Sequence, residues 1–329
     1  MKKILLFLLA IAACNVAANA VVKGDVNGDG NVTAADVTAL YDYMLNNDTS
    51  HFVNGDVDGD GNITSYDITY VYDILLGNVS SEEPQITEYT VNGVTFKMVN
   101  VEGGTFTMGG TAEQGNDVYN SELPAHQVTL SSFTIGQTEV TQELWQAVMG
   151  SNPSAFNGYS YGVNLQRPVE KVTWNDCQQF IATLNQLTGK NFRLLTEAEW
   201  EYAARGGNKS QGYKYSGSND INDVALYWGN IPSHSSGTAG YGTQPVASRQ
   251  PNELGIYDMS GNVLEWCSDW YVSGYSSEAQ VNPTGPESGS RRVLRGGSFA
   301  REANACRVSC RDGWSPTGIF SDIGLRLAM

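Results

Sequence analysis

The chain has 329 residues with 35 acidic and 19 basic side chains, and its net charge of −16 argues against nucleic acid as a partner. Charged residues make up only 16% of the chain, whereas glycine (36) and tyrosine (17) are abundant. This composition favours a loop-rich globular protein, and the length allows one large domain and one small domain.

Residues 1–20 are typical of a signal peptide, because two lysines precede an apolar run and an A-x-A cleavage pattern ends at residue 20. We therefore expect export, to the medium or to the cell surface. The segment Ile11–Cys14 offers an alternative, because it resembles a lipobox in which Cys14 would carry a lipid anchor. No other apolar run approaches the length of a membrane span. Four cysteines would remain after cleavage, an even number that permits disulfides without requiring them: Cys177, Cys267, Cys306 and Cys310.

An acidic segment follows, in which residues 24–36 recur as residues 55–67. Each copy has side-chain oxygens at positions 1, 3, 5 and 12 of a loop and glycine at position 6, which is the pattern of an EF-hand calcium loop with Asp as its last ligand. The predicted ligands are Asp25, Asn27, Asp29 and Asp36 in the first copy, and Asp56, Asp58, Asp60 and Asp67 in the second. We expect one calcium ion in each loop, since an acidic linker would not explain the shared register.

A helix is predicted after each loop from apolar residues that recur at helical spacing. The two stripes are Val37, Leu40, Tyr41 and Met44, and Ile68, Val71, Tyr72 and Leu75. Two such helices can pack on each other, but a unit of this size buries little apolar surface, so its folding is expected to depend on the metal.

Residues 21–78 resemble a type I dockerin, the calcium-dependent module that attaches proteins to cohesin-bearing scaffolds, including those that degrade polysaccharides. The resemblance implies that loop positions 10 and 11 contact the cohesin. These positions hold Ala34 and Ala35 in the first copy and Ser65 and Tyr66 in the second, so recognition is expected mainly at the second copy. The alternative is a calcium-stabilised spacer without a cohesin partner. The polar residues 79–90 are predicted to form a linker.

The large domain, residues 91–329, is predicted to mix short strands with few helices. An Asn92-Gly93 turn should join two strands. Thr141 is a helix N-cap candidate, Trp174 to Leu187 has helical spacing up to Gly189, and Thr196 opens a capping box.

Four motifs of this domain resemble the formylglycine-generating enzyme, or sulfatase-modifying factor, family: residues 192–207, 255–266, 295–299 and 323–326. The resemblance implies an α+β fold of the C-type-lectin-like kind. It also implies a calcium ion held by Asp258, Gly261, Val263 and Glu265. A second calcium site of the family would use Asn230, but its acidic ligand is missing near Tyr241.

The family's oxidase chemistry uses two cysteines that bind copper(I), and only thiolates suit that ion. The first of these positions is Arg301 and the second is Cys306, so the family's copper site is incomplete and copper is not expected. A displaced pair formed with Cys310 is the alternative to cysteines that are buried or disulfide-bonded.

Three functions remain open from the sequence. The first is a non-catalytic binding module, for a glycan or a protein, on a secreted dockerin-bearing chain. The second is an active or altered formylglycine-generating oxidoreductase that modifies a sulfatase cysteine, with Cys306 as its catalytic residue. The third is a surface lipoprotein with a structural role. The fold alone does not separate them.

Overall fold

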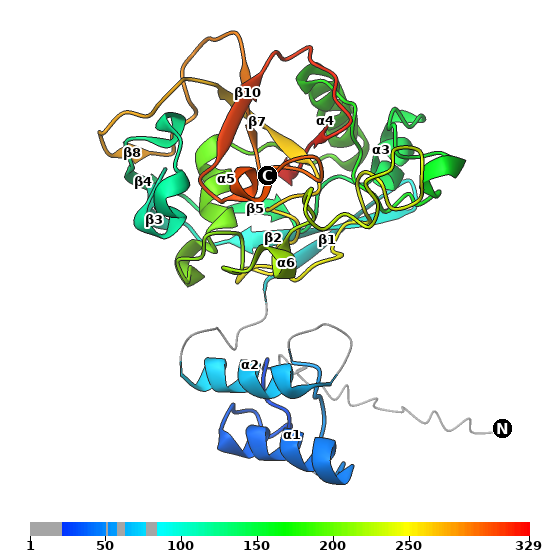
Figure 1. The fold of residues 1–329 in the computed structure, drawn as a ribbon, viewed down its shortest axis with the longest axis vertical. Helices are drawn as coiled ribbons and strands as arrows, with labels where there is room; N and C mark the ends of the chain where they lie inside the picture. Colours follow the sequence, from blue (N-terminus) through cyan, green and yellow to red (C-terminus); the bar gives the residue numbers. More distant parts are fainter. Residues whose placement is uncertain (1–21, 51, 58–62, 77–83) are drawn as a thin grey trace, which may run out of the picture. The chain divides into compact units, whose positions relative to one another are not determined.

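The computed structural model describes residues 22–50, 52–57, 63–76 and 84–329, which form two compact units that we treat separately (Figure 1). The predicted signal peptide, the lipobox Cys14, and the predicted ligands Asp58 and Asp60 lie outside the described residues. Within the described ranges, every helix is too short or too polar to cross a membrane.

The small unit consists of two loop–helix repeats whose helices are α1 (Ala34–Asn46) and α2 (Ser65–Leu75). Thr33 and Thr64 are the N-caps, and both belong to capping boxes. Its core contains Val37, Leu40, Ile68 and Val71, as predicted, together with Val26 and Val57 from the loops.

The second half of each predicted apolar stripe is not buried. Tyr41 and Met44 on α1 are 45% and 40% exposed, and Tyr72 and Leu75 on α2 are 47% and 39% exposed. The assignment of these four side chains to the core was wrong because the cluster between the helices is small and is completed by loop residues. Their exposure leaves apolar surface on the small unit.

The large unit contains three sheets. The five-stranded sheet has the order β1 (Ile86–Val91), β2 (Val94–Val101), β5 (Phe133–Gly136), β12 (Leu327–Ala328) and β6 (Arg193–Leu194). The four-stranded sheet has the order β10 (Arg311–Trp314), β9 (Arg292–Arg295), β7 (Leu264–Trp270) and β11 (Ile323–Gly324). The three-stranded sheet has the order β3 (Gly104–Met108), β4 (His126–Leu130) and β8 (Gln280–Val281).

The predicted Asn92-Gly93 turn joins β1 to β2, and both residues have the positive φ angles that this tight hairpin requires. Strand β1 begins at Ile86, so residues 86–90 belong to the sheet and not to the linker. The sequence pattern missed this because β1 is an edge strand, most of whose residues are exposed.

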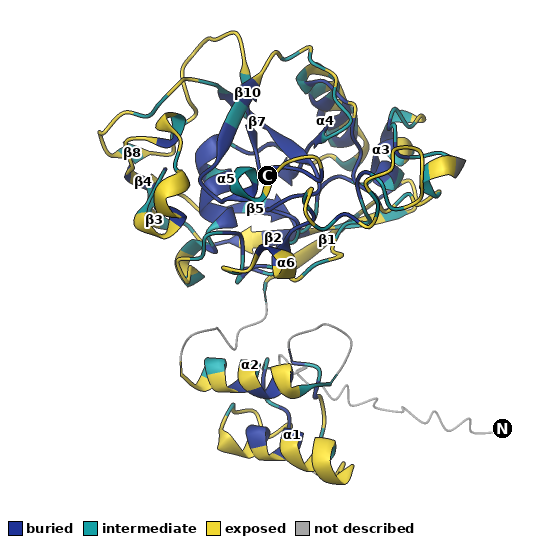
Figure 2. Ribbon diagram, viewed as in Figure 1, coloured by how far each residue is buried: buried dark blue, intermediate teal, exposed yellow. Residues whose placement is uncertain are grey.

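Four helices complete the large unit: α3 (Gln142–Met149), α4 (Trp174–Thr188), α5 (Glu197–Ala204) and α6 (Ile221–Val224). Short 3₁₀ segments lie at Ala112–Asp117, Asn120–Glu122, Tyr159–Tyr161, Gly207–Lys209 and Ala303–Cys306. The predicted caps Thr141 and Thr196 are present, and Gly189 ends α4 in the left-handed conformation. Helix α5 is almost entirely buried and lies at the centre of this unit (Figure 2). The α+β prediction is therefore confirmed.

Candidate functional site

The first acidic loop of the small unit is organised by its own carboxylates. Asp25 accepts hydrogen bonds from the backbone N–H groups of Asp29 (3.0 Å) and Gly30 (2.8 Å). Asp36, the last predicted ligand, accepts from the N–H groups of Asn27 (3.0 Å) and Thr33 (2.7 Å). The structure therefore brings the four predicted ligand positions of this loop together.

The described part of the second loop repeats that arrangement. Asp67 accepts from the N–H groups of Val57 and Thr64, each at 2.7 Å, and like Asp36 it is fully buried. Asp36 and Asp67 thus close a loop and at the same time occupy the third helical position of a capping box.

The described small unit has one cationic side chain, Lys23, which lies 4.6 Å over the ring of Tyr70. The hydrogen bonds that the structure describes at Asp25, Asp36 and Asp67 come mainly from backbone N–H groups. Among the described residues, no three His, Cys, Asp or Glu side chains are already arranged as a metal centre. The charge in the first loop nevertheless fits a hard cation with oxygen ligands.

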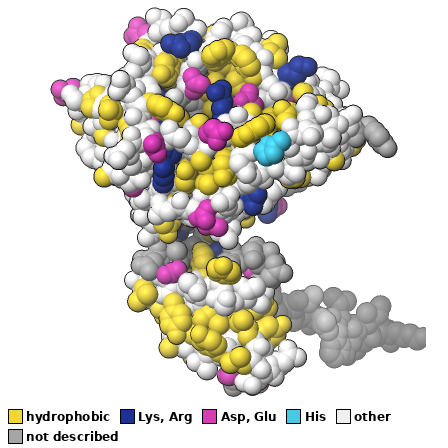
Figure 3. Space-filling model, viewed as in Figure 1, with side chains coloured by type: hydrophobic (Ala, Val, Ile, Leu, Met, Phe, Trp, Pro, Cys, Tyr) yellow, Lys and Arg dark blue, Asp and Glu magenta, His cyan; other side chains and the backbone are white. Residues whose placement is uncertain are grey.

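The predicted partner-binding positions lie in the first turns of the two helices, and all four residues are exposed: Ala34, Ala35, Ser65 and Tyr66. Tyr66 is 74% exposed, whereas its counterpart in the first repeat is only an alanine. Leu45 and Leu76, both more than 70% exposed, add to the apolar surface of the small unit, which Figure 3 shows as hydrophobic side chains over its helices.

In the large unit, the predicted calcium ligands Asp258 and Glu265 are buried beside a guanidinium. Arg326 binds Glu265 at 2.7 Å and also donates to the carbonyl of Gly136, while Trp200 Nε1 donates to Glu265 at 2.7 Å. Asp258 has a left-handed backbone (φ 59°) and accepts from the N–H of Ala247 at 2.7 Å. Gly261 and Val263 lie between them in the same buried turn.

Glu139 is a third carboxylate of this cluster, and no sequence pattern marks it as a candidate ligand. It accepts from Asn262 Nδ2 (2.7 Å) and from the N–H of Val263 (3.0 Å), residues more than 120 positions away in the chain. Burial, with the nearby charges of Asp258 and Glu265, raises the pKa of Glu139 well above its usual range. Burial also raises the pKa of Asp258, to about 6.

The position of the family's first copper ligand is a half-exposed guanidinium. Arg301 lies 3.7 Å from the carboxylate of Asp322, and its carbonyl accepts from the N–H of Trp228 at 3.0 Å. Trp228 in turn packs against His234, with ring centroids 4.6 Å apart. The surface around residue 301 therefore presents a cation and aromatic rings.

Cys306, the second copper position, is fully buried. Burial, followed by the neighbouring Cys310, raises the pKa of its thiol to about 12, and burial raises the pKa of Cys310 to about 11. All four cysteines of the described residues are buried free thiols, so burial holds and none of the four forms a disulfide.

Three buried ion pairs support the segment around these cysteines, and the sequence did not reveal them. They are Arg295 with Glu201, Arg307 with Glu122 at 2.7 Å, and Arg311 with Glu197 at 2.6 Å. Arg295 also donates to the carbonyl of Cys310 at 2.6 Å. These pairs fix the segments around residues 295 and 307–311 in the core of the large unit.

At the second calcium site implied by the family resemblance, the side chain of Asn230 is hydrogen-bonded to the protein backbone. The Asn230 side chain accepts from the N–H of Tyr227 and donates to the carbonyl of Ala225, so it stabilises a turn of the protein.

Comparisons with known proteins support the two-part organisation. Residues 84–329 match the family described as sulfatase-modifying factor enzyme 1-like domain, and residues 23–76 match the dockerin type I domain. A chaperone protein LppX of Paenibacillus barcinonensis is 36% identical over 278 residues, which is 71% of this chain and 89% of that protein. The formylglycine-generating enzyme of Streptomyces coelicolor is 30% identical over 285 residues, which is 70% of this chain and 88% of that enzyme.

Among solved structures, the variable protein 1 of Treponema denticola has 36% sequence identity and a TM-score of 0.66. The match covers 74% of this chain and 99% of that one. The predicted fold of the large domain, the formylglycine-generating enzyme type of the C-type-lectin-like fold, is confirmed by these matches.

Proposed function

The chain belongs to the sulfatase-modifying factor family through residues 84–329 and carries a type I dockerin domain at residues 23–76, and on that premise we propose that it is a secreted, scaffold-attached binding protein. Its large unit lacks the family's copper oxidase chemistry and acts by binding. Its small unit binds calcium and a cohesin. Export follows from the signal peptide predicted in residues 1–20, with lipid anchoring at Cys14 as the alternative.

The proposed loss of oxidase chemistry rests on Arg301, which counting along the family motif places where the first copper thiolate would be. A guanidinium has no lone pair to give to copper(I), and it repels a cation. The remaining Cys306 is fully buried, and its raised pKa keeps it a thiol at neutral pH. The similarity to a protein named as a chaperone agrees with a role that requires binding and no oxidation.

The cohesin proposal rests on the exposed apolar side chains of the small unit. Tyr66 stands in the first turn of α2, and Tyr72 and Leu76 follow along the same helix. Apolar surface of this kind in a unit of two short helices is the signature of a partner site.

Calcium is proposed at both loops of the small unit and at one site in the large unit. At the large site, three buried carboxylates share one guanidinium, Arg326, so a divalent cation held by Asp258, Glu265 and the carbonyls of Gly261 and Val263 would balance the charge. Glu139 would remain beside this ion, bonded to the same turn. The ion would stabilise the turn and supply no redox chemistry.

The oxidase question is tested with the full-length mature protein and copper(I), measuring metal stoichiometry and oxygen consumption on a cysteine-containing sulfatase peptide. We expect no tight copper site and no turnover, with an active formylglycine-generating enzyme as the positive control. Copper bound one-to-one through Cys306, together with turnover, would establish the oxidoreductase alternative instead. The variant Arg301→Cys shows whether a second thiol alone restores copper binding.

The cohesin question is tested by retention of the full chain on a panel of immobilised cohesins, in calcium and in chelator. We expect retention in calcium only. Tyr66→Ala makes the second repeat resemble the first at this position and should weaken retention, whereas Ala35→Ser in the first repeat should not. If no cohesin retains the chain, the small unit is a calcium-stabilised spacer.

A further inference from the structure

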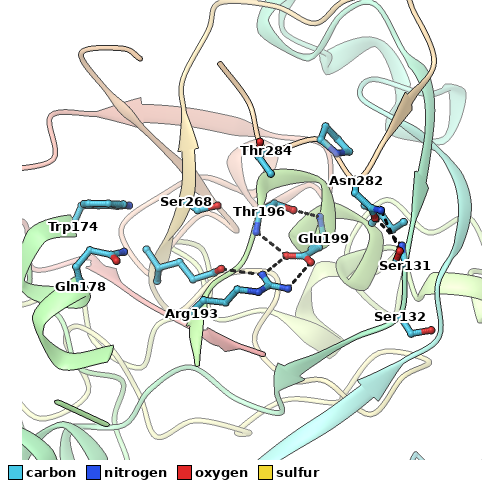
Figure 4. A pocket seen from close by; sticks show the side chains of 13 residues that line it. Ser131, Ser132, Trp174, Gln178, Arg193, Thr196, Glu199, Ser268, Asn282 and Thr284 are labelled. Carbon is cyan, nitrogen blue, oxygen red and sulfur yellow. Dashed lines mark hydrogen bonds and ion pairs between the residues drawn. The ribbon is translucent and has the colours of Figure 1, made fainter. Parts of the chain in front are cut away.

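The large unit has a cavity of about 600 Å³ between α4, the start of α5, and the segments that follow β4 and β8 (Figure 4). Trp174 and Gln178, one turn apart on α4, lie on one side of it. Asn282 and Thr284 lie on the other side, with Arg193 between the two walls. No residue from 295 to 311 lines this cavity, so it is separate from the surface around Arg301.

The cavity carries no net charge. Arg193 and Glu199 are the only charged residues that line it, and they form a two-point ion pair with both N···O distances at 2.7 Å. Glu199 is held further by the N–H of Thr196 at 2.9 Å. The chain has a net charge of −16, but the lining of this cavity is neutral, so the cavity favours neither cations nor anions.

Most of the other lining residues have uncharged side chains that can form hydrogen bonds. Within the described residues, the amide of Gln178 and the hydroxyl of Thr284 have no hydrogen-bond partner in the protein, so both are available to a ligand. Asn282 is fixed by two bonds to Ser131, one to its hydroxyl at 3.1 Å and one from its N–H at 2.8 Å. Hydrogen bonds therefore hold Asn282 in place, while Gln178 and Thr284 on the opposite walls keep donors and acceptors for a ligand.

Trp174 supplies a preorganised aromatic surface. Its Nε1 donates to the carbonyl of Cys267 at 2.9 Å, and the guanidinium of Arg292 lies 4.0 Å from its ring and 3.5 Å from that of Trp270. A ring immobilised in this way loses little conformational entropy when a ligand packs against it.

We propose that this cavity binds a segment of an uncharged glycan. A neutral saccharide offers many hydroxyl groups to amides and hydroxyls, and its C–H faces pack on an indole, so it matches the neutral charge, the unused polar groups and Trp174 together. A charged ligand would find no unpaired opposite charge among the residues that line the cavity, because Arg193 and Glu199 already neutralise each other. This inference rests on the proposed function of the large unit as a binding module, and it names the ligand class.

The test measures binding of the full chain, in calcium, to neutral hexasaccharides of β-glucan, xylan and mannan, with polygalacturonate and a sulfated glycan as charged probes. Titration calorimetry should detect at least one neutral saccharide and neither charged one. Gln178→Ala should weaken that binding about five- to tenfold, because a single neutral hydrogen bond is lost. Thr284→Arg should abolish it by filling the cavity with a charged side chain.

Gln179→Ala is the matched control, because Gln179 is the next residue of α4, is exposed and does not line the cavity. It should bind like the unaltered chain. Cohesin retention of each variant shows whether the small unit still works, and the thermal transition of the large unit shows whether it is folded. A folded variant that is retained on cohesin but binds no saccharide therefore counts against the glycan proposal and not against scaffold attachment. The proposal would be overturned if no neutral saccharide bound to the chain. It would also be overturned if Gln178→Ala and Thr284→Arg both bound the saccharide as tightly as the unaltered chain.

Discussion

The small and large units both bury carboxylates, but they neutralise them in different ways. In the small unit, Asp36 and Asp67 are fully buried and accept hydrogen bonds from backbone N–H groups. In the large unit, buried glutamates lie against buried arginines, as in the pairs of Arg326 with Glu265 and Arg307 with Glu122. A guanidinium brings a full opposite charge, whereas a backbone N–H brings only part of one.

The difference indicates where each unit obtains its stability. The large unit contains most of its own counter-charges, and it has two large apolar clusters. The small unit has one small cluster and, among the described residues, a single cation, so we expect bound calcium to supply positive charge to its acidic loops. The cluster of Glu139, Asp258 and Glu265 is an exception within the large unit, because only Glu265 of these three buried acids forms an ion pair with Arg326.

The largest expected effect tests the small unit. Asp56→Ala combined with Asp60→Ala should unfold the second repeat at 25 °C, because it removes two of the four predicted ligands of that loop and folding there depends on the ion. The large unit should keep its transition. Calorimetry together with far-ultraviolet circular dichroism, in excess calcium, measures both. Loss of the large unit's thermal transition would show that the two units do not fold independently.

The next largest effect is expected from Arg295→Met in the large unit. Arg295 is fully buried against Glu201 and also lies 3.4 Å from Glu197, so its removal takes one of two arginine partners from each of these buried glutamates. Such losses cost about 3–5 kcal/mol, and the melting temperature should fall by about 10 °C. Adding Glu201→Gln to the same chain should recover part of the loss. An unchanged melting temperature for the single variant would contradict the role given to these pairs.

A smaller, pH-dependent effect is expected at Glu170, whose Oε2 is buried without a hydrogen-bond partner in the described structure. Burial raises its pKa from 4.5 to about 7. The folded state therefore favours the protonated acid, and its stability falls as the pH rises from about 4.5 to above 7. Glu170→Gln does not titrate, so it should stabilise the large unit by about 2–3 kcal/mol at pH 8 and by little at pH 4.

Chemical denaturation of the large unit at the two pH values measures this difference. A gain of equal size at both would show that the effect comes from packing and not from the charge.

The smallest effect is expected from Lys97→Ala. Lys97 lies 3.8 Å from Glu88, and both side chains are about half exposed, so solvent screens the pair. We expect a change below about 0.5 kcal/mol in the free energy of unfolding. A loss comparable to that of Arg295→Met would mean that burial does not decide which ion pairs stabilise this unit.

Features set by neighbouring residues could be predicted from the sequence. The capping boxes at Thr33, Thr64 and Thr196 depend on residues three positions apart, and all three are present. The replacement at residue 301 could be found by counting along a family motif. Local patterns and the order of motifs were therefore enough to predict the fold, the candidate ligands of the first acidic loop, and the candidate ligands Asp258 and Glu265.

Features built from distant segments could not be predicted. Glu139 reaches Val263 across 124 positions, and no local pattern distinguishes it from an exposed glutamate. The neutral cavity is lined by segments spread from residue 130 to residue 284. Helical spacing also predicted wrongly that Tyr41 and Tyr72 are buried. Spacing identifies the apolar face of a helix, but it does not show how much of that face contacts the other helix.

The double use of Asp36 and Asp67 has a consequence for the timing of recognition. Forming the first turn is the slow and unfavourable step in making a helix, and here the residue that stabilises that turn is also a predicted loop ligand. If calcium binds as proposed, occupancy of the loop sets when each helix nucleates. Ala34, Ala35, Ser65 and Tyr66 lie in those same first turns. A chain still in a calcium-poor compartment would then have no docking face to display, and would acquire one only on reaching calcium.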